Sequence, residues 1–328
     1  GTDVHKLDKG HMPVSPGTAS MQNDNLLVLL ALSLIPGMGS RRIQQFVGVL
    51  EGQGYDLSRL AVDKPEFVTA HIPQAQPQFK GVLEHLAGSS LAEARACIDR
   101  AHRSGLALTC LKDEDYPACL KEFLENAAPP VLFLYGAKSL FQNKAAAVVG
   151  TRFPTEPGLL AARRTAEALT GAGLTLVSGG AAGVDWAAHD AAVAGGGSTI
   201  IFLPEGIGRF ALPHSWKIAL EEGRVLLASE YLPDAPWQTY AAVSRNALIA
   251  AQSLLVCVIE PRKRGGSVLT ARHAMEQGKP VFVEPPCALL AALGRYASPL
   301  DRVTDLLTDA GKENFSCLYS RPKQSKLF

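Results

Sequence analysis

The stretch "LTLVSGGAAGVDWAAH", residues 174–189, decides the fold that we expect for this chain. It begins with a short apolar run, which is typical of a buried β-strand. The run breaks at a series of glycines and continues as a helix-like segment from Val184. Glycines between a strand and a helix allow a ligand to approach the backbone closely, so the stretch predicts a binding loop as well as a βα unit.

The same alternation repeats along the second half of the chain. Apolar runs predict strands at residues 145–150, 174–179, 198–203, 224–230, 253–260 and 280–285. Helical spacing predicts helices at residues 156–172, 184–194, 214–222, 241–251 and 267–277. Strands that are apolar throughout and alternate with helices are typical of parallel sheets buried on both faces. We therefore expect an α/β fold with an extended Rossmann-like, mainly parallel sheet that helices cover on both faces.

A small helical domain is expected before this sheet. The four expected parts are an expression leader and flexible N-terminus at 1–23, the helical domain at 24–104, the Rossmann-like domain at 105–290 and a short C-terminal tail at 291–328. Within the helical domain, "IPGMGSRR" (35–42) predicts two helices joined by a Gly-x-Gly turn, as in a SAM-like or helix-hairpin-helix domain. Such a turn could grip a DNA phosphate, although a tight turn between packed helices explains the same residues.

Composition narrows the classes of function. The net charge is +1, so a nucleic-acid partner would have to be held by a local basic patch. None of the six cysteines has metal-ligand spacing, and the apolar run 26–35 is too short to cross a bilayer. These features predict a cytoplasmic protein with reduced cysteines, no metal site and no membrane partner.

The ends of the predicted strands are the expected place for a ligand, because open parallel sheets bind ligands beyond the carboxyl ends of their strands. Three of the five strand-end segments are glycine-rich and lead into helices, which favours phosphate binding by backbone N–H groups. Ser178 stands where a G-x-G-x-x-G dinucleotide motif needs glycine, and the chain has no Walker A sequence. A dinucleotide site and a P-loop are therefore not expected.

Asp185 and His189 suggest a second hypothesis. They lie four residues apart on one side of a predicted helix and could act as acid and base on a bound nucleotide. A structural role explains them equally. The helix dipole favours an acidic residue near a helix start, and a histidine one turn later can pack in the core.

Several segments together resemble the DNA-processing protein A (DprA/Smf) family. They are "VVGTRFPTEPG", "LVSGGAAGVDWAAHDAAVAGGGSTIIFLPEGIGRF", "SRNALIAA" and "GGSVLTARHAMEQGKPVFVEP", in the order found in that family. The resemblance spans residues 25–285 and implies a homodimer that holds single-stranded DNA in a basic pocket. It also implies protection of incoming DNA in natural transformation and help in loading the recombinase RecA, without catalysis, cofactor or metal.

The residues expected to hold DNA phosphates are glycines, hydroxyl groups, an amide and cations at the strand ends. The resemblance implies Gly150, Thr151, Arg152, Ser178, Gly179, Gly183, Arg245, Asn246, Gly266, Ser267 and Thr270. Neighbouring strand-end residues add Gly180, Arg262, Lys263, Arg264 and Gly265. Aromatic residues near the strand ends could stack on bases or belong to the core; they are Phe153, Trp186, Tyr231, Trp237 and Tyr240.

This sequence departs from the family at two charged positions. The family usually has a basic residue where Ala182 stands and a second arginine where Ala247 stands. Fewer cations weaken the binding of a phosphate backbone, and the charges at residues 262–264 are candidates to compensate. A nucleotide-binding sensor or a nucleotide hydrolase that uses the same cleft therefore remains the alternative function.

Overall fold

The computed structural model describes residues 4–5, 24–72, 79–262, 265–284, 297–303 and 307. Most of the expected leader (1–23) and of the expected tail (291–328) lies outside these residues.

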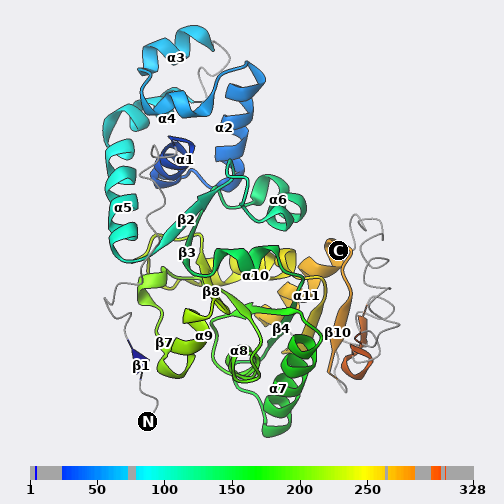
Figure 1. Ribbon diagram of the computed structural model, residues 1–328. Coiled ribbons are helices and arrows are strands. Elements are labelled where there is room, and N and C mark those ends of the chain that lie inside the picture. The colour runs from blue at the N-terminus through cyan, green and yellow to red at the C-terminus, as the bar shows by residue number, and fades with distance from the viewer. Residues whose placement is uncertain are drawn as a thin grey trace. The chain divides into compact units, whose positions relative to one another are not determined.

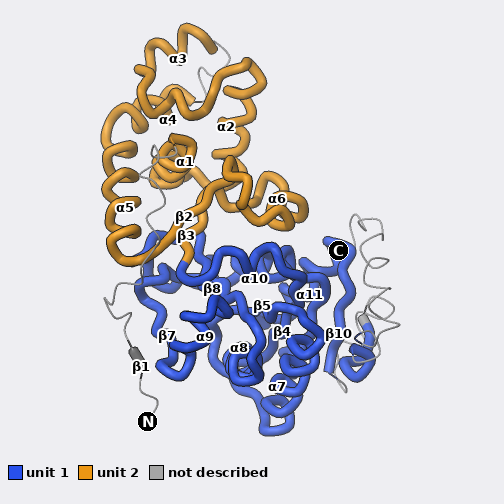
Figure 2. The backbone as a smooth tube through the Cα atoms, viewed as in Figure 1, with its two compact units in different colours: residues 1–7, 135–328 blue, residues 8–134 orange. Residues whose placement is uncertain are grey.

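The chain forms two compact units, which Figure 2 distinguishes by colour. Unit 1 comprises residues 1–7 and 135–328, and unit 2 comprises residues 8–134. The division after Leu134 groups residues 105–134 with the helical part, whereas the sequence analysis assigns them to the Rossmann-like domain.

Unit 2 is built around one buried helix. This helix, α1 (Asp24–Leu34), contains the expected apolar run except for its last residue, Ile35, and every residue from Leu27 to Leu32 is buried. A helix that is apolar on all sides belongs in the interior, and α1 contacts α2, η1 and α5. The other elements of unit 2 are α2 (Ser40–Gly52), η1 (Leu57–Ala61), α3 (Pro65–His71), α4 (Lys80–His85), η3 (Leu86–Ser90), α5 (Leu91–Arg103), β2 (Ala107–Cys110), α6 (Ala118–Leu124), η4 (Glu125–Ala127) and most of β3 (Val131–Gly136), which pairs antiparallel with β2.

The expected pair of helices joined by a Gly-x-Gly turn is present as α1 and α2. Gly37 in the turn has a φ of +79°, a left-handed conformation that favours glycine. Arg41 and Arg42 are exposed in the first turn of α2. Within the described ranges, no helix is both long enough and apolar enough to cross a membrane.

A parallel sheet forms the centre of unit 1. Its strands are β4 (Ala145–Gly150), β5 (Thr175–Gly179), β6 (Thr199–Phe202), β8 (Val225–Ser229), β9 (Val256–Ile259), β10 (Val281–Val283) and β11 (Ala297–Pro299). They lie in the order β11-β10-β9-β4-β5-β6-β8, and each neighbouring pair is parallel. The expected strands and the mainly parallel sheet are confirmed. The sequence analysis missed β11, because "ASP" has no apolar run.

The strand order reverses at β4. The strands that follow it in sequence, β5, β6 and β8, lie on one side of it, whereas β9 and β10 lie on the other. Such a reversal opens a crevice beyond the carboxyl ends of the two strands that meet there, because their connections leave in opposite directions. In this sheet those strands are β4 and β9.

Two pairs of helices cover the sheet. One pair is α7 (Glu156–Gly171) with α8 (Val184–Ala194), and the other is α10 (Thr239–Gln252) with α11 (Gly266–Glu276). Figure 1 shows the two pairs on opposite sides of the strands, as expected. Ala146 and Val148 of β4 belong to the apolar core beside α7 and α8. Because side chains alternate along a strand, Val149 faces α10 and α11.

The remaining elements of unit 1 are short. They are η5 (Lys138–Gln142), η6 (Ile207–Arg209), β7 (Leu212–Pro213), η7 (His214–Trp216), α9 (Lys217–Glu221), η9 (Leu300–Arg302) and β1 (Val4–His5), which pairs antiparallel with β7. The helix expected at 214–222 is thus divided into η7 and α9.

Candidate functional site

A cavity of about 600 Å³ lies beyond the carboxyl end of β4, at the reversal of strand order. Its walls come from the loop after β4, the start of α8, one face of α10 and the segment that leads from β9 into α11. This is the place where an open α/β sheet is expected to bind a ligand.

The cavity brings together most of the residues expected from the sequence. The expected residues that line it are Gly150, Thr151, Arg152, Arg245, Asn246, Arg262, Gly265, Gly266, Ser267 and Thr270. Ser178, Gly179, Gly180 and Gly183 are not in its wall. Lys263 and Arg264 lie outside the described residues.

The glycine-rich loop after β5 makes close contacts inside the protein. Gly183 has a φ of +86°, and a β-carbon at this position would lie 2.5 Å from the carbonyl oxygen of Thr151. The next residue, Val184, donates its N–H to that same oxygen at 3.1 Å. Gly183 therefore lets α8 begin directly against the loop that follows β4.

The carboxylate of Asp185 occupies part of the phosphate-binding position that the sequence analysis predicted. It is buried, and the backbone N–H groups of Gly150 and Gly179 donate hydrogen bonds to it. The neighbouring hydroxyl group of Ser178 donates to the carbonyl oxygen of Val148 at 2.5 Å. Burial raises the pKa of Asp185 to about 6, although Arg245 and these hydrogen bonds act in the opposite direction. Two of the N–H groups assigned to DNA phosphate thus already bind a carboxylate of the protein.

Arg245 is a buried cation that crosses the end of β5. Its side chain donates from Nη1 to the carbonyl oxygen of Phe202 at 2.8 Å, and the residue is only 5% exposed. Its Nε atom is buried without a hydrogen-bond partner among the described residues. Burial lowers the pKa of Arg245, whereas Asp185 and Glu205 raise it. Arginine remains charged in proteins, so Arg245 balances these carboxylates.

His189 is held inside the fold. Its Nε2 lies 3.0 Å from the carbonyl oxygen of Gly179, and its Nδ1 lies 2.6 Å from Oγ1 of Thr199. Burial lowers the pKa of His189 to about 4, so the ring is neutral at pH 7. A neutral ring that donates from Nε2 to Gly179 and accepts at Nδ1 satisfies both contacts. Asp185 lines the cavity but His189 does not, so the two side chains do not face a common ligand space.

Among the described residues of the cavity wall, the exposed cations are Arg152 and Arg262, and each contacts an aromatic ring. The guanidinium carbon of Arg152 lies 5.6 Å from the ring centroid of Trp237. That of Arg262 lies 5.2 Å from the ring centroid of Phe153. Both distances are within the range of a cation–π interaction.

The start of α11 adds backbone donors to the same wall. Gly265 is its N-cap residue, and Gly266 and Ser267 form its first turn. The first N–H groups of a helix have no partner within the helix and attract anions. A β-carbon on Gly266 would lie 3.4 Å from Nδ2 of Asn246, so glycine leaves room for that amide beside the helix start.

Of the wall formed by α10, the sequence analysis named Arg245 and Asn246 but missed Thr239, Ala242 and Ile249. Thr239, Ala242, Asn246 and Ile249 all line the cavity. They are spaced three and four residues apart, as expected for one face of a helix. Extending that spacing from Asn246 in both directions could have found them. Among the other aromatic residues considered, Trp186 is half-buried and packs on Phe210 and Trp216, at centroid distances of 5.7 and 5.3 Å.

Comparison with known proteins decides the family. Residues 107–294 match the family model described as DNA recombination-mediator protein A. The chain belongs to this family. The match includes every strand of the parallel sheet from β4 to β10 and the whole wall of the cavity.

Individual members of the DNA recombination-mediator protein A family show the extent of the similarity. Protein Smf of Synechocystis is 34% identical over 180 residues, which are 53% of this chain and 44% of that protein. The chain thus matches less than half the length of this relative. A crystal structure of DNA processing protein A from Streptococcus pneumoniae has a TM-score of 0.62 at 25% identity, covering 87% of this chain and 99% of that one.

A second solved structure, of DNA processing protein A from Helicobacter pylori, was described for its single-stranded DNA binding mode. It has a TM-score of 0.53 at 26% identity and covers 63% of this chain and 96% of that one.

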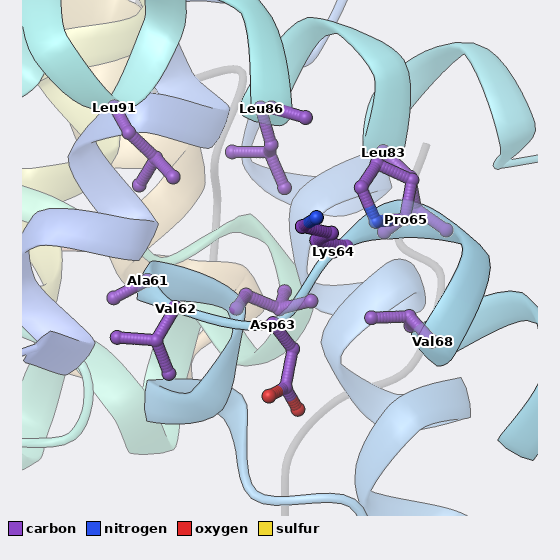
Figure 3. Close-up of a pocket in the computed structure, with 11 residues that line it drawn as sticks. Ala61, Val62, Asp63, Lys64, Pro65, Val68, Leu83, Leu86 and Leu91 are labelled. Atoms are coloured by element: carbon purple, nitrogen blue, oxygen red, sulfur yellow. The ribbon is translucent and has the colours of Figure 1, made fainter.

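Unit 2 contains a separate, smaller cavity of about 210 Å³ between the η1–α3 segment and the α4–α5 segment (Figure 3). Leu83, Leu86 and Leu91 give it an apolar wall, as Figure 3 shows. The carboxylate of Asp63 is bound elsewhere, because it accepts a hydrogen bond from Tyr55 at 2.7 Å and pairs with Arg59 at 3.1 Å. Its described lining residues form no cluster of polar groups comparable to that at the strand ends.

Proposed function

We propose that the protein binds single-stranded DNA in the strand-end cavity and acts as a recombination mediator rather than as an enzyme. The observation that carries the proposal is the mouth of the cavity, the part of its wall that is formed by the exposed Arg152 and Arg262 and by the start of α11. Cations and unpaired N–H groups are the partners that a DNA backbone uses. Membership of the DNA recombination-mediator protein A family supports the same role.

The structure changes which residues we assign to the phosphates. Arg245, Ser178 and Gly179 contact groups of the protein, so we propose that they hold the loops of the site in place. Arg152, Arg262 and the backbone N–H groups at Gly266 and Ser267 are the proposed phosphate contacts. Thr151 lines the same wall and supplies a hydroxyl group, whereas the buried hydroxyl group of Thr270 donates to the carbonyl oxygen of Gly266 at 3.2 Å.

The family resemblance leads us to propose two protein partners as well. They are a second copy of this chain and the recombinase RecA, with protection of incoming DNA in natural transformation as the cellular role. Sedimentation at several protein concentrations tests for the dimer. RecA assembly on a single strand, measured with and without this protein, tests the mediator role; an unchanged assembly rate would contradict it.

The proposed contacts are tested by Arg152→Gln and Arg262→Gln in a titration with labelled oligo-dT. Each change should weaken binding and reduce the slope of log affinity against log salt by about 0.7, the contribution of one phosphate on a single strand. Arg163→Gln is the matched control, because Arg163 is an exposed arginine of α7, on the other side of the sheet. Equal effects of all three changes would contradict the placement.

The nucleotide-binding alternative makes a different prediction in the same experiment. A cavity of about 600 Å³ is large enough for a small ligand, and Asp185 is the one acidic residue among the described residues of its wall. A single nucleotide carries few phosphates, so its affinity should depend weakly on salt. Tight binding of a mononucleotide without binding of oligo-dT would favour this alternative.

A further inference from the structure

Two aromatic residues at the cavity remain unexplained by phosphate binding. Phe153 is 75% exposed and Trp237 is 46% exposed, and both line the cavity. Phe and Trp bury large apolar areas when they belong to a core. The exposure of two such rings in one ligand site therefore indicates that they contact the ligand. A single exposed aromatic residue elsewhere on the surface would carry no such indication.

The two rings are linked to the two exposed arginines in a crossed arrangement. Arg152 and Phe153 are adjacent in sequence, but Arg152 lies over Trp237, while Phe153 lies under Arg262. The loop after β4, the loop before α10 and the segment after β9 thus meet at the mouth of the cavity. Two contacts between them join an aromatic ring to an arginine. A guanidinium group stacked on a ring keeps its N–H edges available for hydrogen bonds. Each pair therefore presents a ring surface and a phosphate-binding group side by side.

This combination matches the repeating chemistry of a single strand, in which every nucleotide has a flat base next to a phosphate. Proteins that bind single strands without sequence preference use aromatic platforms for the bases and cations for the backbone. A duplex offers no unstacked base, so platforms favour the single strand. Stacking is also insensitive to salt, which suits a site with alanine at positions 182 and 247.

We propose that Phe153 and Trp237 are base-stacking platforms for two nucleotides of a single strand, and that Arg262 and Arg152 bind the phosphates beside those bases. This inference rests on the proposed function of the cavity. It names the two aromatic residues that let the cavity distinguish a single strand from a duplex. It also attributes part of the affinity for DNA to contacts with the bases.

The test compares Phe153→Ala and Trp237→Ala with the wild type on oligo-dT and on an abasic strand of the same length. The abasic strand keeps the phosphates but has no bases to stack. Each alanine change should lower the affinity for oligo-dT on the order of tenfold, leave the salt slope unchanged and have little effect on the abasic strand. Phe153→Tyr keeps an aromatic ring and should retain most of the affinity.

Tyr240→Ala is the matched control, because Tyr240 is a 67% exposed aromatic residue of α10 that is not in the cavity wall. Thermal unfolding of each variant checks that the fold is kept. Alanine variants that bind oligo-dT as tightly as the wild type, or a wild type that binds both strands equally, would overturn the stacking proposal alone. A wild type that binds neither strand at low salt would overturn the proposed function too.

Discussion

The guanidinium group of Arg245 fills the space beside Gly179 where a side chain would begin, since a β-carbon on Gly179 would lie 1.7 Å from Nη1 of Arg245. The arginine comes from α10 and passes the end of β5 to reach the carbonyl oxygen of Phe202 at the end of β6. Because Gly179 has no side chain, the guanidinium group of Arg245 can connect α10 to the ends of β5 and β6. This arrangement also places that cation near Asp185, whose carboxylate holds the loop after β4.

Gly179→Ala should therefore displace Arg245. We expect a loss of about 1–3 kcal/mol in the free energy of unfolding, as for other insertions into a packed interior. DNA affinity should fall at the same time, because the loops around Asp185 shift. Urea denaturation measures the first effect and an oligo-dT titration measures the second.

Gly171→Ala is the control for that change. Gly171 is the last residue of α7, and a β-carbon there would meet no atom within 4 Å. Alanine is the better helix former by up to about 1 kcal/mol, so stability should stay the same or rise. A loss for Gly171→Ala as large as that for Gly179→Ala would show that the contact with Arg245 is not the cause.

Asp185 and Arg245 should behave as a coupled buried pair. Arg245→Met leaves a buried carboxylate without its cation and should cost about 3–5 kcal/mol of unfolding free energy. Asp185→Asn removes the charge but keeps a side chain near the N–H groups of Gly150 and Gly179. The double variant should lose clearly less than the sum of the two single losses. Additive losses, measured by urea denaturation, would contradict the coupling.

The pH dependence of stability should reveal the neutral, buried state of His189. Its pKa is lowered from 6.5 to about 4 in the folded protein, so the unfolded chain takes up the proton first as pH falls. Stability that is present above pH 6.5 is then lost toward pH 4, by about 3 kcal/mol at most. His189→Gln does not titrate and should not show this loss.

Asp185 acts in the opposite direction over part of the same range. Its pKa is raised to about 6, so the folded state takes up the proton first and acidification below that pH adds stability. This contribution is present in both proteins, so the difference between the wild type and His189→Gln isolates the histidine. Parallel curves of unfolding free energy against pH for the two proteins would show that His189 is not buried as a neutral ring.

The sequence predicted the sheet well, because the relevant signals are local. The apolar run at 145–150 became β4 with the same bounds, and the helix expected at 184–194 became α8. Gly150 and Gly183 were expected to contact a DNA phosphate; in the structure, the atoms that approach them closely belong to the protein itself. A short run of apolar residues that ends at a glycine is compatible with few structures other than a buried strand or helix.

The identity of the approaching group could not be predicted from the same residues. The N–H groups of Gly150 and Gly179 bind Asp185, which lies in the same glycine-rich stretch as Gly179. Nothing in the order of residues says whether such groups bind a ligand or a side chain of the protein. The burial of Arg245 depends likewise on Gly179, which is distant in sequence. The pairing of Arg152 with Trp237 depends on the path of the loop before α10.

The most direct test of this account is the affinity of the wild-type protein for labelled oligo-dT, measured by fluorescence anisotropy over a series of salt concentrations with a duplex of the same length as competitor. We predict tight binding at low salt, a fall in log affinity of about 0.7 per log unit of salt for each bound phosphate, and little displacement by the duplex. Absence of binding at low salt, or equal binding of the duplex, would contradict the claim that the strand-end cavity holds single-stranded DNA.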